Sequence, residues 1–102
     1  MKIYIAGPMT GLPDLNRSAF ERAKQALDAE GHNAVNPHDL HPTDVQWHTA
    51  MRTDIMELLT CDAVALLDNW QNSRGALLEH FIASTLGVPC KPLSDYVAEA
   101  YR

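Results

Sequence analysis

The sequence of 102 residues predicts an α/β protein, with a parallel sheet of four to five strands and helices on both faces. Short β-rich apolar runs alternate with longer segments of helical periodicity. The run 62–68 (DAVALLD) is apolar throughout its centre, as a parallel strand buried on both faces should be. Repeated strand–helix units with right-handed crossovers then place the strands parallel in one sheet.

The chain opens with a strand and a helix. KIYIA, residues 2–6, is a short buried strand, and a loop rich in Gly and Pro follows it. A helix is expected from about Asn16 to Glu30, with Gly31 as its stop. Its apolar positions recur at helical spacing: Ala19, Phe20, Ala23 and Leu27.

A second strand–helix unit follows. HNAV, residues 32–35, is a short strand, and the loop NPHDLHP comes after it. The next helix is expected from about Thr43 to Thr60, with Thr43 or Asp44 as its cap.

The last part repeats the pattern twice. After the strand 62–68, Ser73 caps a third helix that ends near Leu86 and Gly87. VPCKPL, residues 88–93, is a weaker strand whose two prolines suit the edge of a sheet. Residues 94–102 complete the pattern as a terminal helix. We therefore expect one domain over 1–102 with a flavodoxin-like or Rossmann-like sheet.

Composition narrows the possible partners. The net charge of −5 argues against a broad surface for nucleic acid, although backbone amides can still hold a small anion. Cys61 and Cys90 lack metal or redox spacing and fit a reducing cytosol. No leader or membrane segment is recognised, so a cytoplasmic protein without membrane partners is expected.

The small size of the chain favours self-association. A core of 102 residues is marginal alone, so at least a homodimer is expected. The residues expected between the subunits are Met51, Trp70, Tyr96 and Tyr101.

Two acids lie where the helical periodicity predicts partial burial. On a helix that begins after Ser73, Leu78, Phe81 and Ile82 form the buried face, and Glu79 lies on its flank among small residues. Asp54 lies at the edge of the apolar stripe of the second helix. Each acid alone could simply pair with Arg52, Arg74 or a backbone amide. Together they favour a shared cavity, where one carboxylate acts as nucleophile and the other as acid.

The unusual residues gather in loops that follow the predicted strands, where parallel sheets bind ligands. No Gly-x-Gly-x-x-Gly or Walker lysine motif is present, which disfavours dinucleotides and nucleoside triphosphates. His38, Asp39, His41 and His48 invite a metal interpretation. Polar residues are expected in such a loop anyway, so neither a metal nor a cofactor is predicted.

The motifs together resemble the nucleoside 2-deoxyribosyltransferase superfamily, which includes the deoxynucleoside monophosphate N-glycosidases. The resemblance rests on YIAGPMTG, NP, MR-x-D, CDAVALL and SRGA-x-x-E, and it is strongest to small bacterial and phage proteins. It implies that Glu79 is the nucleophile at the anomeric carbon, that Asp54 handles the base, and that Tyr4 orients Glu79. It also implies that Ser73 binds the 5′ end of the ligand.

Other ligand contacts are expected in the same loops. Gly7, Met9 and Thr10 belong to the first loop, and Asp68 and Trp70 to the third. Arg74 and Gly75 open the helix whose N-terminus favours a phosphate, through the amides of Gly75 and Ala76. Trp47 either stacks on the base or packs in the core.

We therefore expect cleavage or transfer at the N-glycosidic bond of a nucleoside or its 5′-monophosphate. The alternative is a non-catalytic nucleotide-binding or sensing module with the same pocket. Both hydrolysis and transfer, with any base or sugar, are compatible with these motifs.

Overall fold

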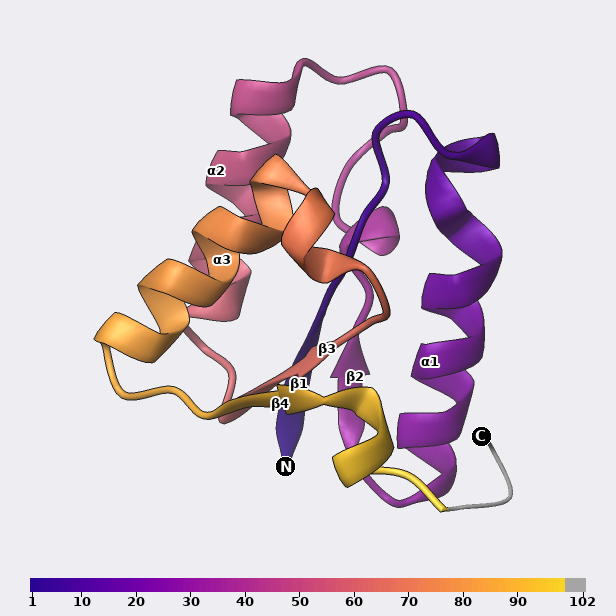
Figure 1. Ribbon diagram of the computed structural model, residues 1–102, viewed down its shortest axis with the longest axis vertical. Coiled ribbons are helices and arrows are strands. Elements are labelled where there is room, and N and C mark those ends of the chain that lie inside the picture. Colours follow the sequence, from indigo (N-terminus) through magenta and orange to yellow (C-terminus); the bar gives the residue numbers. More distant parts are fainter. Residues whose placement is uncertain (99–102) are drawn as a thin grey trace.

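A four-stranded parallel sheet forms the centre of the protein (Figure 1). The computed structural model describes residues 1–98. The strand order is β2-β1-β3-β4, and all three pairings are parallel. The strands are β1 (Lys2–Ala6), β2 (Asn33–Val35), β3 (Ala63–Leu66) and β4 (Cys90–Pro92). This order is the flavodoxin-like arrangement, in which the order of strands reverses between β1 and β3.

Three helices cover the two faces of the sheet (Figure 1). They are α1 (Arg17–Ala29), α2 (Trp47–Leu58) and α3 (Arg74–Thr85). Helix α1 lies on one face, and α2 and α3 lie together on the other. The predicted fold class, with helices on both faces of a parallel sheet, is thereby confirmed.

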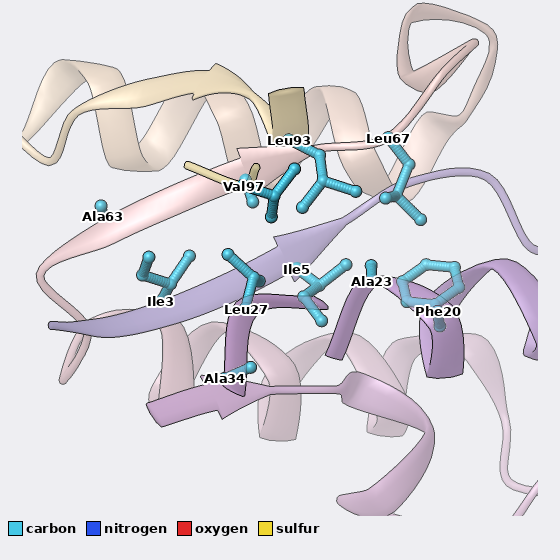
Figure 2. Close-up of a cluster of buried hydrophobic side chains, with 11 residues drawn as sticks. Ile3, Ile5, Phe20, Ala23, Leu27, Ala34, Ala63, Leu67, Leu93 and Val97 are labelled. Atoms are coloured by element: carbon cyan, nitrogen blue, oxygen red, sulfur yellow. The ribbon is translucent and has the colours of Figure 1, made fainter. Parts of the chain in front are cut away.

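The alternation of side chains along β1 builds two separate cores. Ile3 and Ile5 point toward α1, where they pack with Phe20, Ala23 and Leu27 (Figure 2). Tyr4 and Ala6 point the other way, into a core shared with α2 and α3. Because β1 has a neighbour on each side and helices above and below, Ile3 to Ala6 are fully buried.

Several predicted boundaries agree with the structure. The strand 2–6 matches β1, and α1 ends as expected before Gly31, whose φ of +86° is unfavourable for residues with a Cβ. Ser73 caps α3, because its Oγ accepts a hydrogen bond from the Ala76 amide at 3.2 Å.

Two predicted helices are wrong in part. The second helix begins at Trp47, so neither Thr43 nor Asp44 caps it. Residues 41–46 form a turn instead, and that turn carries His41 to the side of α2. In place of a terminal helix, the described chain has a 3-10 turn at Leu93–Asp95 and then irregular structure to residue 98. Residues 99–102, with Tyr101, lie outside the described part.

Short 3-10 turns connect the main elements at Pro13–Asn16, Pro37–Asp39 and Trp70–Asn72. No helix within residues 1–98 is both long and apolar enough to cross a membrane.

Candidate active site

A buried hydrogen bond joins Tyr4 to Glu79. Tyr4 lies in the middle of β1 with its side chain in the α2–α3 core. Glu79 lies in the second turn of α3, on the face that rests against the sheet. The Tyr4 hydroxyl donates to Glu79 Oε2, and both side chains are buried. The fold thus brings together two residues that lie 75 positions apart in the sequence.

The buried face of α3 consists of small residues around this acid. Ala76, Glu79 and Ala83 are buried, whereas Leu78 and Phe81 are 37% and 66% exposed. The predicted buried face of Leu78, Phe81 and Ile82 is therefore wrong. The helix uses alanines where it packs against the sheet, because small side chains allow two elements to approach closely. Its larger apolar side chains point outward.

Asp54 forms a second buried pair with His41. The acid lies on α2 between Met51 and Leu58, and only 5% of it is exposed. His41 Nε2 lies 3.0 Å from Asp54 Oδ1. His41 Nδ1 is 3.2 Å from the carbonyl oxygen of Pro42. Both contacts are hydrogen bonds at the same time when the imidazole carries two protons, or when a protonated Asp54 donates to Nε2 and Nδ1–H donates to Pro42.

Burial dominates the protonation of Glu79. It raises the pKa of this carboxyl from 4.5 to about 8, and the nearby Asp54 charge acts in the same direction. The Tyr4 hydrogen bond opposes the shift without overcoming it. In turn, burial and the Glu79 charge raise the pKa of Tyr4 well above its ordinary value of 10. The Tyr4 phenol therefore stays neutral and acts as a donor.

Asp54 titrates below Glu79. Burial raises its pKa from 3.8 to about 6, against the effects of the His41 charge and hydrogen bond. At neutral pH the proton therefore resides mainly on Glu79 and the negative charge on Asp54. This order is the reverse of the expected one, in which the glutamate is ionised and the aspartate protonated.

A pocket of about 480 Å³ lies at the N-terminal ends of α2 and α3. Its lining includes Thr10, Trp47, Ser73, Arg74 and Gly75. The volume lies in the range of small-molecule sites. Neither acid lines this pocket, but both lie on the helices that do. Gly75 and Glu79, four residues apart, share one face of α3, and Trp47 and Asp54, seven apart, share one face of α2.

The first turn of α3 packs closely against α2 at this pocket. The guanidinium carbon of Arg74 lies 3.9 Å from the ring centroid of Trp47, within cation–π distance. A Cβ on Gly75 would be 3.2 Å from Met51 Sδ, so this position favours a residue without a side chain. Of the two helix amides expected to be free, that of Ala76 is already bonded to Ser73.

The structure distributes the remaining predicted ligand residues differently. Gly7 packs against Leu67, with only 2.8 Å between the Leu67 Cβ and a Cβ built on the glycine. Met9 packs against the core on the α1 side. Asp68 lines a separate pocket of about 480 Å³ on that side. Trp70 lies against the His80 ring, with 4.5 Å between the centroids. None of these four residues lines the pocket that contains Thr10 and Ser73.

Sequence reasoning missed the role of His41 as the partner of Asp54. It weighed the histidines of this loop only as metal ligands. Within residues 1–98 no group of three His, Cys, Asp or Glu side chains is arranged to hold a metal ion. His38 instead bonds to the carbonyl oxygen of Leu15 and packs edge-on against Phe20. The spacing of His41 and Asp54 follows no helical or strand period, so no sequence signal predicted their contact.

Fold and site together define an α/β protein with a pocket at the carboxyl ends of its strands and two buried carboxyl groups on the helices that line it. Residues 1–91 match the family model described as "Domain of unknown function (DUF4406)", and the chain belongs to this family. No curated protein matches the chain.

Among solved structures, the fold is similar to that of a 2-deoxyribosyltransferase from the psychrotolerant bacterium Bacillus psychrosaccharolyticus. The TM-score is 0.70 and the sequence identity 21%, and the match covers 88% of this chain and 69% of that chain. This similarity establishes a common fold.

Proposed function

We propose that this protein cleaves or transfers the N-glycosidic bond of a nucleoside or its 5′-monophosphate, with Glu79 as the nucleophile. The observation that carries the proposal is the pair of buried carboxyl groups, each with its own partner, on the two helices whose first turns line a pocket of suitable size. The fold that the chain shares with a 2-deoxyribosyltransferase supports the same class of substrate.

The two acids supply the charge and the proton that this reaction needs. With pKa values of about 8 and about 6, Glu79 and Asp54 together hold one proton at neutral pH. In the reactive arrangement the proton lies on Asp54 and Glu79 is ionised. Two pKa units separate this arrangement from the more stable one, which corresponds to about 3 kcal/mol. Substrate groups that stabilise the Glu79 charge would reduce this difference.

In the first step, Glu79 attacks C1′ of the sugar while the bond from C1′ to the base nitrogen breaks. The bond electrons leave with the base, and Asp54 gives its proton to the departing base. Tyr4 directs the Glu79 carboxylate, and His41 stabilises the Asp54 anion that remains. The product is a glycosyl ester on Glu79.

In the second step, water or another base attacks C1′ of this ester. Asp54 accepts the proton that the incoming group loses, and Glu79 leaves as the carboxylate. Water completes hydrolysis, whereas a second base completes transfer. Both outcomes use the same residues.

A 5′-phosphate would lie at the N-terminus of α3. Ser73 and Arg74 line the pocket there, and the helix dipole favours an anion. Arg74 is held in place by Trp47, which lowers the cost of ordering its side chain on binding.

The alternative function is nucleotide binding without turnover. One observation favours it: burial leaves Glu79 protonated at neutral pH, and a neutral carboxyl group is a poor nucleophile.

Chromatography of released base, over a panel of deoxynucleosides and their 5′-monophosphates, tests the proposal. We expect base release from at least one substrate. Glu79→Gln should abolish release and keep ligand affinity within about tenfold, because it preserves size but cannot form the carboxylate nucleophile.

The matched control is Glu57→Gln. Glu57 lies on α2, does not line the pocket, and pairs with Lys2 at a distance of 2.8 Å. This variant should retain activity. Saturable binding in calorimetry with no base release from wild type would instead support the binding module. Undiminished release by Glu79→Gln would exclude Glu79 as the nucleophile.

A further inference from the structure

The outer face of α2 and α3 is unusually apolar. We define this outer face by Ile55, Met56, Leu77, Leu78 and Phe81. Met56 is 72% exposed, Phe81 66% and Leu77 45%. Leu77 and Leu78 adjoin Phe81 at helical spacings of four and three residues. Leu78 also shares a groove of about 470 Å³ with Ile55 and Met56, which makes the face continuous across both helices.

Helix α3 is apolar on both sides. Ala76 and Ala83 face the sheet, and Leu77, Leu78 and Phe81 face outward. Large apolar side chains that gather on an exposed helix face often mark an interaction site. The sheet covers one side of α3, and no described segment covers the other (Figure 1).

We propose that the outer face of α2 and α3 binds the same face of a second copy of this chain. Its four most exposed side chains and the groove present on the order of 500 Å² of apolar surface, the size of the largest, often functional, patch on a monomer. This area is more than half of the roughly 800 Å² that each partner contributes to a standard interface. The core of such an interface is thus already present on one chain.

The face is suited to pairing with itself. A two-fold contact brings identical patches together, so each copy must offer both a protrusion and a recess. Phe81 protrudes from α3, and the groove beside Leu78 is the recess. In such a dimer, Phe81 of each copy would enter the groove of the other, so that both side chains and both grooves are buried.

Charge favours a second copy over other occupants. Each chain carries a net charge of −5, yet no acid of α2 or α3 is free on this face. Asp54 and Glu79 are buried, and Glu57 is paired with Lys2. Two copies therefore meet here without opposing carboxylates, and the charged side chain that each brings to the groove is Arg52. An anionic membrane surface, in contrast, would repel the chain as a whole.

The groove also adjoins the candidate active site. Trp47 lines both the groove and the pocket that contains Ser73 and Arg74. A second copy on the outer face would therefore lie at the edge of that pocket. The residues expected earlier at a subunit interface differ from this face. Met51 borders the groove but is only 8% exposed, and Trp70 and Tyr96 lie elsewhere.

Methionine oxidation locates the interface without any mutation. Sedimentation or light scattering should first show twice the chain mass of 11.3 kDa at micromolar concentration. Dilute peroxide should then oxidise Met56 more slowly in concentrated, dimeric samples than in dilute ones. Met1, which is 57% exposed and off this face, is the internal control and should react equally in both. Equal rates for Met56 would overturn the proposal, as would a monomer at every concentration.

Phe81→Glu provides an independent test, because the side chain is exposed in a single chain and its replacement should not disturb folding. We expect the dissociation constant of the dimer to rise at least thirtyfold, about the effect of losing a central anchor. Leu12→Glu, at an exposed apolar position in the first loop, should leave the dimer intact. A dimer that survives Phe81→Glu would place the interface elsewhere. If circular dichroism shows that this variant is unfolded, the oxidation rates of Met56 in concentrated and dilute wild-type samples test the proposal instead.

Discussion

His41 and Asp54 form a buried pair that joins a loop to a helix, with Nε2 and Oδ1 3.0 Å apart. The histidine counteracts part of the effect of burial on its partner, since its charge and hydrogen bond both lower the pKa of Asp54. The pair therefore sets the pH at which this acid can give or accept a proton.

The first prediction concerns the pH dependence of base release. The proposed reaction needs one proton on the pair Asp54 and Glu79, and either acid can carry it in the resting protein. The profile of kcat/KM should therefore be bell-shaped, with limbs near pH 6 and pH 8. Rates of base release across this range provide the measurement. A profile that is flat between pH 5 and 9 would contradict the assignment of both acids.

The second prediction concerns His41→Ala. Without the imidazole, the pKa of Asp54 should rise above about 6, because only the effect of burial remains. The acidic limb of the profile should then move to higher pH, and the bell should narrow. His32→Ala, which removes a histidine that contacts the N-terminal amine, is the control and should leave both limbs in place. An unmoved acidic limb would mean that His41 does not tune Asp54.

The third prediction links Glu79 to stability. Its pKa is raised on folding, so the folded state binds this proton more tightly than the unfolded chain does. The resulting stabilisation is complete below pH 4.5 and is lost as the pH rises toward 8, by at most about 1.4 kcal/mol per pH unit. Asp54 contributes in the same direction only up to about pH 6. Between pH 6 and pH 8 the loss due to Glu79 continues, whereas His38, whose pKa burial lowers from 6.5, acts in the opposite direction. A Glu79 variant is therefore needed to separate the two effects.

Glu79→Gln should remove that loss. Chemical denaturation at several pH values should show wild type losing stability between pH 6 and pH 8, and the variant losing much less. Glu57→Gln should follow wild type, because it leaves the buried acid in place. Parallel curves for wild type and Glu79→Gln would show that Glu79 does not titrate in this interval.

The fourth prediction separates the phosphate role of Ser73 from its role as a helix cap. Asp and Asn both cap helices well, but only Asp adds a negative charge to the pocket. Ser73→Asp should weaken binding of a 5′-monophosphate at least tenfold while sparing the neutral nucleoside. Ser73→Asn should preserve binding of both, as measured by calorimetry. Equal weakening of both ligands by Ser73→Asp would leave Ser73 as a cap alone.

Elements whose structure depends on short-range signals could be predicted from the sequence. The apolar run that becomes β3 and the Gly31 stop are short-range features, and both were predicted correctly. The start of α2 was not, because Thr43 and Asp44 have good capping side chains but lie in the turn that brings His41 to Asp54. A tertiary contact overrode the local preference there.

For the site, the partial burial of Glu79 and Asp54 was predicted, but the face of α3 that meets the sheet was not. Hydrophobicity could not distinguish the two sides of this helix, since Ala76 and Ala83 lie on one and Leu78 and Phe81 on the other. The small residues face the sheet because they allow the helix to pack closely against it. The pKa order of the two acids likewise depends on burial and on His41, which only the folded chain reveals.

The two-sided character of α3 constrains how this sequence can change over evolutionary time. Positions 76 and 83 have no spare space, so natural variants there should be limited to Gly, Ala or Ser. Positions 77, 78 and 81 face outward and should vary in shape while staying apolar, each change matched by another on the surface that it meets. The two sides of this helix of 12 residues would thus vary under different constraints: one side is limited by the space against the sheet, and the other by the surface that it binds.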